Sequence, residues 1–515
     1  MGWHHSIALL SLSLSFVVLL GLWFFLIIKA IFPYGQLRFS KGLLQFLLIG
    51  FFTGLFVVRN HSAFPQKHRL YYDEDVYANI SANILKGYGG KVTELYTENE
   101  KEVRPYKWPL GFPVGMAPFV AALGPEEGPV LFNECCIALC LLILAGIAAR
   151  LASNLYAGYF VLLFFGFHPI VGNWARAGSS EPLALLLVLL FLFAVVESAY
   201  RKKRGDGLAP AWTAAACIAG GIALHVRLEN ILILIPLILA FKKCSFRFSR
   251  VHFFLLFLTI PLLLLSYGCH LLSLGKYYMA DIPESSFSLS YFSNNLMVNR
   301  AFWLRYSPFY FVLFGALMLL LYLGNYRKAG PLDPTLTAAA FSVPVVHFLI
   351  LLFYSVGKYN VPGGSRFFLV QVMGASLAGA VFLAKNLAFR YGYVLAAAGI
   401  FFFFLTVPDR QEFNEFLTEL TSDTNAEHEW VRRWSADLPE DAVVISQLPC
   451  LWENFGVYSM FPGYLNYKSL PPSALIYEHY GLFRPFSRPI LEDVSILVDS
   501  LPIENDAVIL FYQAN

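Results

Sequence analysis

Long apolar runs recur along most of this 515-residue chain, and they restrict its fold more than any other feature. Hydrophobic residues make up 57% of the sequence and charged residues 14%, against about 25% charged in an average soluble protein. A helix needs roughly 20 apolar residues to cross the hydrocarbon, whereas a membrane barrel shows alternating segments of about ten residues. We therefore predict an all-α polytopic membrane protein. Hydropathy places about twelve spans near 7–31, 42–58, 129–149, 155–172, 182–200, 211–225, 229–241, 252–274, 306–324, 335–355, 367–384 and 391–407.

Basic residues gather in alternate loops between these spans, and short loops rich in Lys and Arg stay in the cytoplasm. The opposite face then receives residues 59–128, the loops 275–305 and 356–366, and the tail 408–515. Both termini are expected outside the cytoplasm. The basic residues that set this orientation are Lys29, Arg38, Lys41, Arg150, Arg201, Lys202, Lys203, Arg204, Lys242, Lys243, Arg247, Arg250, Arg327, Lys328, Lys385 and Arg390.

The short basic loops leave no room in the cytoplasm for a domain that binds a soluble cofactor. The chain has no GxxxxGK[ST] loop, and no GxGxxG follows a predicted strand. Its seven cysteines lack metal-ligand spacing, and a net charge of +3 gives no reason to expect nucleic acid as a partner. A reaction on the opposite face must therefore use an activated donor that crosses the bilayer itself, or a gradient.

The densest acidic cluster lies in the first long polar stretch, where residues 71–85 read YYDEDVYANISANIL. Val76, Ile80 and Ile84 recur every four residues, which predicts one apolar face of a helix. We expect this helix to lie in the membrane interface and to hold a carboxylate at headgroup depth. The alternative is an acidic cap on a surface helix, because the helix dipole favours anions at its start. The acidic residues are Asp73, Glu74 and Asp75.

Four later segments on the same face place ionisable residues beside apolar spans, where charges are costly and are functional candidates by default. In GIALHVRLENILILIP, residues 221–236, Arg227 and Glu229 separate two apolar runs that are each too short to cross the bilayer. Every segment also has a structural alternative as an interfacial anchor, a paired turn or a helix start. The candidates are Arg104 and Lys107; His168, Arg176 and Glu181; His225, Arg227 and Glu229; and Lys358 and Arg366.

The tail from about residue 408 has frequent charges and a different pattern. DAVVISQL (441–448) and DAVILFY (506–512) predict buried strands, and EHEWVRRW (427–434) predicts a helix. We therefore expect a transmembrane module at 1–407, with a first outer loop at 59–128 that holds interfacial helices. A small extracytoplasmic α/β domain is expected at 408–515.

The order of these motifs resembles the GT-C glycosyltransferases, within them the dolichyl-phosphate-mannose protein mannosyltransferase-like group of bacterial membrane enzymes. YYDEDVYANISANILKGYG looks like that group's first-loop signature of an Asp-Glu pair, a Tyr three residues later and a final Gly-x-Gly. KWPLGFPVGMAPF, ARAGSSEPLALLLVLL, VRLENILILIP and SRFFLVQVMGASLA are similar to its Pro-Pro-Gly-Tyr-Pro, Ser-Glu-Pro, Arg-Pro-Glu-Gly and Arg-Tyr segments. EWVRRWSADLPEDAVVIS looks like its outer C-terminal domain.

The resemblance covers most of the chain, with departures at specific positions. Leu228 stands where Pro is common, Asn230 where Gly is common, and Trp108 in place of a small residue or Pro. Two apolar spans, not one, precede the acidic loop. These differences affect the expected substrate pocket more than the expected reaction type.

The resemblance implies an inverting transferase that moves a sugar from a polyprenyl-phosphate donor to an acceptor hydroxyl on a glycan, lipid or protein. It makes Asp73 the general base, while Glu74 orients the acceptor or Asp73. It implies donor-phosphate contacts from Arg227 and Arg366, and then from Arg176 and Lys107. Further substrate contacts are expected from Tyr77, Asp75, Glu181, Glu229 and Lys358.

The resembled group also implies a location and a cofactor state. The protein is expected in a bacterial inner (plasma) membrane, with its active site facing the periplasm or exterior. No metal is expected, because that group works without one; a divalent metal is the less favoured alternative.

Two other functions remain open at this stage. An O-antigen ligase or polymerase also joins lipid-linked glycans outside the cell, but such enzymes usually carry their main polar loop late in the chain. A transporter or flippase of lipid-linked glycans would place ionisable residues at mid-membrane and show inverted repeats. We see no repeat in the sequence, and its charges gather at one face.

Overall fold

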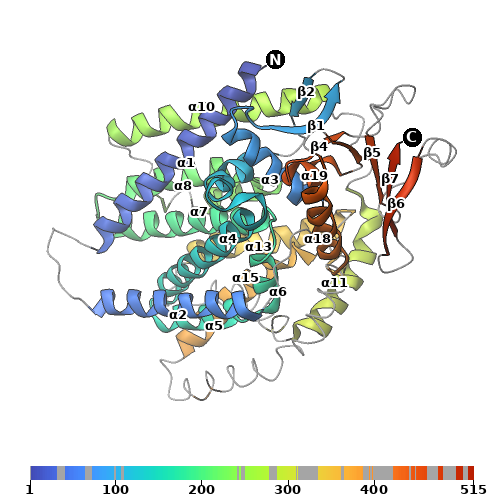
Figure 1. Cartoon of the computed structure of the whole chain (residues 1–515). Helices are drawn as coiled ribbons and strands as arrows, with labels where there is room; N and C mark the ends of the chain where they lie inside the picture. The colour runs from blue at the N-terminus through green and yellow to red at the C-terminus, as the bar shows by residue number, and fades with distance from the viewer. Residues whose placement is uncertain are drawn as a thin grey trace.

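A computed structural model shows a helical bundle with a β-sheet at one end (Figure 1). Lys107 and most of the expected spans 306–324 and 391–407 lie outside the residues that the structure describes. The described residues are 2–31, 41–63, 72–97, 100–105, 109–240, 243–244, 250–277, 287–308, 310, 312, 334–355, 357–360, 365–386, 394, 397, 422–439, 442–446, 448–460, 474–479, 495–502 and 508–514.

The described part of the chain contains five helices that are long and apolar enough to cross a membrane. The broken pair α5–α6, bent by 72°, passes the same test as one unit. The predicted all-α polytopic membrane fold is confirmed, while the count of about twelve spans stays a prediction. The five helices are α1 (Gly2–Ile31), α4 (Gly111–Ala152), α7 (Glu181–Lys203), α13 (Pro334–Phe353) and α15 (Phe368–Asn386), and the pair is α5 (Tyr156–Gly166) with α6 (Pro169–Ala175).

Other helices complete the bundle (Figure 1). They are α2 (Lys41–Ala63), α3 (Tyr72–Leu85), α8 (Ala209–Leu224), the 3-10 helix η2 (Leu228–Ile233), α9 (Leu234–Ala240), α10 (Arg250–Tyr277), the 3-10 helix η4 (Leu289–Tyr291) and α11 (Phe292–Tyr306). A short antiparallel hairpin of β1 (Lys91–Thr97) and β2 (Glu100–Pro105) joins α3 to α4.

Helix α4 begins well before the predicted span 129–149. The sequence analysis placed residues up to 128 in an outer loop, but the helix starts at Gly111 and breaks only at Gly124, whose φ of 83° is the left-handed conformation that glycine adopts readily. Gly111 is also needed for close approach, because a Cβ there would lie 2.4 Å from the carbonyl oxygen of His225. The start of α4 is thus locked against the end of α8.

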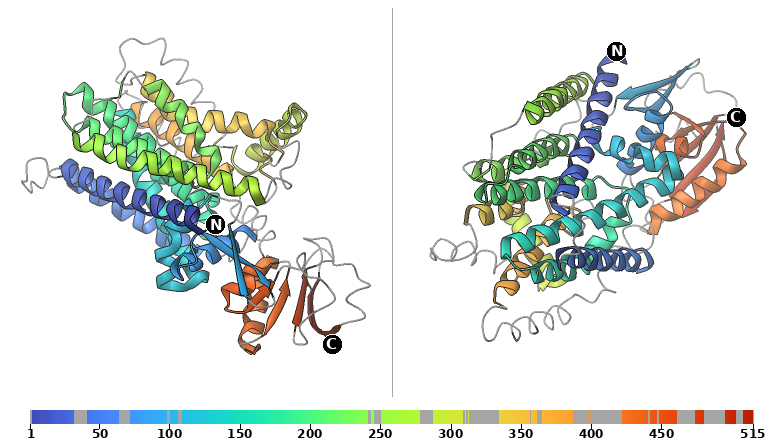
Figure 2. Two further views of the ribbon diagram at one scale, coloured as in Figure 1. Left: turned by 90° about the horizontal axis from the view of Figure 1, so that it is seen from above. Right: turned by 90° about the vertical axis from the view of Figure 1, so that its left-hand side faces the viewer.

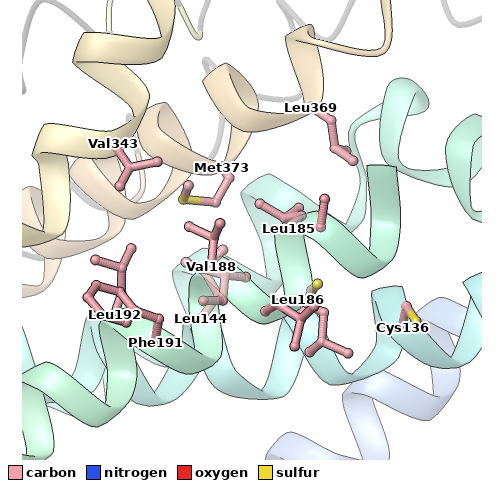
Figure 3. Packing of buried hydrophobic residues seen from close by; sticks show 14 of the residues in the cluster. Cys136, Leu144, Leu185, Leu186, Val188, Phe191, Leu192, Val343, Leu369 and Met373 are labelled. Carbon is pink, nitrogen blue, oxygen red and sulfur yellow. The ribbon is translucent and has the colours of Figure 1, made fainter. Parts of the chain in front are cut away.

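One apolar cluster joins the spanning helices. Figure 3 shows Leu185, Val188 and Leu192 of α7 among side chains of α4, α13 and α15, including Val343 and Leu369. Most of α7 is buried, which fits a helix surrounded by other helices in the middle of a bundle.

The described residues after 421 form a mixed five-stranded sheet with two helices, in the strand order β4-β3-β5-β7-β6. β3 is parallel to β4 and β5, whereas β7 is antiparallel to β5 and β6. The predicted strands and helix correspond to β3, β7 and α18, and the sheet lies at one end of the bundle (Figure 2). The domain boundary at 408 stays a prediction. The elements are α18 (Ser422–Asp437), β3 (Val443–Ser446), α19 (Pro449–Asn454), β4 (Tyr458–Met460), β5 (Ala474–His479), β6 (Ser495–Pro502) and β7 (Val508–Ala514).

Candidate active site

The acidic cluster occupies the first turn of α3, as the sequence predicts. Asp73 is half-buried, and Glu74 and Asp75 are each 4% exposed. Val76 and Ile80 on the apolar face of this helix are fully buried in protein, and its position at the membrane interface stays a prediction. The start of α4, the hairpin and α19 cover α3, so protein fixes the carboxylates in place.

Two contacts hold α3 on the start of α4. The rings of Tyr77 and Phe112 lie 5.1 Å apart in an edge-on arrangement. The Ser81 hydroxyl donates to the carbonyl oxygen of Pro113 at 2.9 Å. On its other side, the acidic turn is close to the loop before α7, since a Cβ added at Gly178 would lie 3.9 Å from Cβ of Glu74.

Arg227 lies between α8 and η2 and has an extended backbone conformation. The sequence predicts an interruption of the helix at this position. Two contacts hold His225, two residues before Arg227. Its carbonyl accepts from the Gly111 amide at 2.7 Å, and its Nε2 lies 3.0 Å from the Leu263 carbonyl oxygen. Asn230 Nδ2 donates to the Ala223 carbonyl at 2.8 Å and closes the turn. The guanidinium therefore projects from a rigid corner.

Glu181, at the first position of α7, lies between two guanidinium groups. Its Oε1 pairs with Nη1 of Arg227 and lies 3.3 Å from Nε of Arg366. Arg227 Nη2 also pairs with Glu229 Oε1 at 3.0 Å. The ring of Phe367 lies beside both guanidinium groups, 5.2 Å from Arg366 Cζ and 5.6 Å from Arg227 Cζ. We call Glu181, Arg227, Glu229 and Arg366 the outer charge cluster.

Tyr77 links the acidic turn to the outer charge cluster. Burial, and after it the negative charge of Asp73, raise the pKa of the Tyr77 phenol above its ordinary value. Arg227 and Arg366 act on the same phenol in the opposite direction, so both arginines lie within electrostatic reach of it. The phenol stays protonated and can donate a hydrogen bond at any physiological pH.

A cavity opens beside the outer charge cluster, with about 580 Å³ of atom-free space including its open side. All four charged residues of the cluster, with Asn230 and His347, form the polar part of its lining. The rest is apolar and is lined by Ala184, Leu185, Val188, Leu232, Ile233, Val343, Phe367, Leu369 and Val370. A charged end joined to an apolar trough suits an amphipathic ligand with an anionic head and a hydrocarbon tail.

Comparisons with known proteins agree with this architecture. No protein-family model and no curated protein matches the sequence. Among solved structures, ArnT from Cupriavidus metallidurans bound to undecaprenyl phosphate matches with a TM-score of 0.55 and 12% identity, over 90% of this chain and 97% of that chain. Its apo structure matches over the same shares with a TM-score of 0.51 and 13% identity. The chain has the GT-C fold.

A third match extends the comparison to an archaeal protein. The apo oligosaccharyltransferase from Archaeoglobus fulgidus gives a TM-score of 0.50 at 10% identity, over 84% of this chain and 66% of that chain. Identities this low establish the GT-C fold alone. The chemistry of this chain is therefore argued from its own residues.

Not all of the predicted site residues come together at this end of the GT-C fold. Arg176 pairs with Glu134 at 2.7 Å, away from the outer charge cluster. Lys358 lies in a turn after α13 and is not among the residues that line the cavity. Asp73 is also outside the lining, although its charge and those of Arg227 and Arg366 all act on the pKa of Tyr77. His168 is buried, and its Nδ1 accepts from the Ile170 amide, which fits the structural role that its turn suggests.

Sequence reasoning missed two ionisable residues, His347 at the cavity and Glu134 beside Arg176. His347 borders the cavity from α13, and its Nδ1 lies 3.0 Å from Gln371 Nε2. Glu134 contacts His61 Nδ1 at 3.0 Å as well as Arg176. Glu134 and His347 are ionisable residues inside predicted spans, and that signal marks candidates by default.

The C-terminal sheet domain contacts the acidic helix directly. Asn454, the last residue of α19, donates from Nδ2 to the backbone carbonyl of Asp75 at 3.1 Å. Arg432 of α18 lies 3.6 Å from Glu126, just after the break in α4. Within the described part of the chain, no group of three His, Cys, Asp or Glu residues is placed to hold a metal.

Proposed function

We propose that this protein is an inverting glycosyltransferase that moves a sugar from a polyprenyl-phosphate donor to an acceptor hydroxyl. The observation that carries the proposal is that the acidic turn of α3 lies close to the loop before α7, whose first residue, Glu181, pairs with Arg227 and Arg366. The acceptor is a glycan, lipid or protein. We place the protein in a bacterial inner membrane, as the resembled group implies, and the charge of the loops turns this end towards the periplasm.

The cavity supports a lipid-linked donor. Its apolar lining from α7, α13 and α15 suits the first isoprene units of the donor. Arg227 and Arg366 line the same cavity and would contact the phosphate attached to those units. A guanidinium offers a planar fork of donors that matches phosphate oxygens. Glu181 and Glu229 hold the arginines in place and, in this proposal, act as positioning residues as much as substrate contacts.

The acidic turn supplies the base. Asp73 takes the proton from the acceptor hydroxyl as its oxygen bonds to the anomeric carbon, and the bond from that carbon to the phosphate oxygen breaks. The configuration inverts, and polyprenyl phosphate leaves with both electrons of that bond. Glu74 orients the acceptor or the base, and Asp75, buried to the same degree, is a further substrate contact. A positioned base contributes roughly 10²–10⁴-fold to the rate.

The leaving phosphate gains a negative charge as the bond breaks, and fixed cations stabilise such a charge best in a site of low dielectric. Arg227 and Arg366 line the cavity and are in position for this, whereas Arg176 is not among the lining residues. Tyr77, kept protonated, can donate to a substrate oxygen between the base and the arginines. No step requires a metal ion.

The test measures transfer and binding separately in Asp73→Asn. Purified protein is incubated with a panel of radiolabelled polyprenyl-phosphate sugars and membrane extract, and undecaprenyl phosphate binding is measured in detergent. We expect turnover to fall roughly 10²–10⁴-fold with lipid-phosphate affinity unchanged. Asp437→Asn, on the exposed end of α18, is the matched control. Full turnover in Asp73→Asn, or labelled lipid crossing the bilayer without transfer, would contradict the proposal, and the second result would favour the transporter.

A further inference from the structure

Side-chain amides from α11 hold the segment that joins α13 to α15. Asn295 Nδ2 donates to the backbone carbonyls of Leu351 at 3.0 Å and Tyr354 at 2.8 Å. Leu351 lies in the last turn of α13, where a helix leaves carbonyls without a helical partner, and Tyr354 directly follows the last residue of the helix. A side chain from another helix therefore caps α13.

Asn299, one turn further along α11, binds the next part of the same segment. Its Nδ2 donates to the Gly357 carbonyl at 2.9 Å, and its Oδ1 accepts from the Tyr359 amide at 2.9 Å. Gly357 cannot carry a side chain, because a Cβ would lie 1.9 Å from the Leu351 carbonyl oxygen. The side-chain amide of Asn299 thus makes the pair of hydrogen bonds that a neighbouring β-strand would make with the backbone of Gly357 and Tyr359.

Aromatic packing continues this contact past Arg366. Phe302 and Trp303 of α11 each have ring centroids 5.1 Å from the ring of Phe368, the first residue of α15. Tyr359 packs on Phe368 at 5.1 Å from the other side of the segment. Helix α11 therefore fixes the chain both before and after Arg366.

The orientation of α11 is unusual for a surface helix. Asn295 and Asn299 are fully buried, whereas Leu296 and Met297 are exposed, Met297 at 64%. Phe302, Trp303 and Tyr306 are buried on the same face, so the two amides share that face with apolar packing. Buried amides are favourable when their hydrogen bonds are made, and here Asn295 Nδ2 and both polar atoms of the Asn299 side chain bond to residues 351–359.

We propose that Asn295 and Asn299 are positioning residues that hold Arg366 against Glu181 for the phosphate of the donor. The inference rests on the proposed function, since Arg366 matters to a lipid phosphate only if the cavity binds one. Removing either amide frees the 351–359 segment and lets Arg366 move away from the cavity. The outer charge cluster then keeps Arg227 but loses its second guanidinium.

The experiment is a double-mutant cycle on undecaprenyl phosphate binding to the full chain in detergent. Asn299→Asp keeps the shape of the side chain but cannot donate to Gly357, and we expect about tenfold weaker binding. Arg366→Gln should weaken binding by a similar factor. The double variant should lose little more than either single variant, because both remove one interaction. Asn294→Asp, exposed on the same helix, adds the same charge and should bind as the wild type does.

Three results would overturn the inference. Additive losses in the double variant, or unchanged binding in Asn299→Asp, would show that Arg366 does not depend on α11, while leaving the proposed function intact. Unchanged binding in Arg366→Gln would remove the phosphate role of that residue and the inference with it. If Asn299→Asp does not fold, Asn299→Ser, which keeps a donor, takes its place in the cycle with an expected loss of about threefold, and Asn295→Asp tests the first amide.

Discussion

Helix α7 carries a buried glutamate between two arginines at each of its ends, and the two clusters differ in how they are satisfied. Glu197 pairs through Oε1 with Arg150 and through Oε2 with Arg201, and Arg201 is held further by Asp206 at 2.6 Å. Glu181 instead shares one oxygen, Oε1, between Arg227 and Arg366. The two glutamates are sixteen residues apart, which corresponds to about 24 Å along the helix.

The comparison teaches that a buried ion pair is not by itself a sign of function. In the Glu197 cluster each carboxylate oxygen pairs with a different arginine. These pairs hold the C-terminal ends of α4 and α7 together, where the helix dipole favours basic side chains. The Glu181 cluster borders a cavity and lies within reach of a second set of carboxylates through Tyr77. We therefore assign stability to the first cluster and ligand binding to the second.

The largest effect is expected from Glu197→Ala. Removing one partner of a buried charge pair leaves the other charges uncompensated, at a cost of about 3 kcal/mol. The unfolding midpoint in detergent should fall sharply, and the folded fraction should still bind undecaprenyl phosphate. Glu429→Ala, exposed on α18, is the control. Normal stability with lost lipid binding would reverse the two assignments.

Arg227→Lys should have the next largest effect, this time on binding. Lysine keeps the charge but cannot contact Glu181, Glu229 and a phosphate with one planar fork. We expect roughly 10- to 100-fold weaker binding of undecaprenyl phosphate by fluorescence titration. Arg201→Lys makes the same change at the other end of α7 and should leave affinity unchanged. Equal losses in both variants would show that the clusters act alike.

Asn454→Ala separates the two halves of the outer end. It removes the hydrogen bond to the Asp75 carbonyl, worth about 1 kcal/mol, and loosens the acidic turn without touching the arginines. We expect kcat to fall about fivefold with lipid-phosphate affinity preserved. A loss of affinity with kcat intact would mean that the sheet domain supports the donor side and not the base.

Lys358→Gln should have the smallest effect. The residue was expected among the substrate contacts, yet the structure keeps it out of the cavity lining. Transfer rate and affinity should stay within about twofold of wild type, as for a surface substitution away from special features. A tenfold loss would show that the turn after α13 closes onto the substrate.

The sequence predicted those parts of the site that depend on local patterns. The four-residue repeat around Val76 gives α3, and the interrupted apolar runs give the corner at Arg227. The pattern of charges beside apolar spans also predicted Glu181 and Arg366 as site residues. Only the fold shows that they contact each other.

The other parts of the fold and the site depend on contacts between segments that are distant in the sequence, and local sequence patterns do not encode such contacts. The early start of α4 follows from the fit of Gly111 against His225, more than a hundred residues away. The burial of α3 follows from the C-terminal helix α19, and the place of His347 at the cavity follows from how α13 packs. A pairing such as Arg176 with Glu134 likewise needs the bundle to be assembled.

The most direct test of the central claim is a cryo-EM structure of the protein in nanodiscs with a non-transferable polyprenyl-phosphate sugar analogue. We predict the phosphate in contact with Arg227 and Arg366, the lipid tail between α7, α13 and α15, and the anomeric carbon turned towards Asp73. An analogue bound at the Glu197 end of α7, or one whose sugar lies beyond reach of the acidic turn, would contradict it.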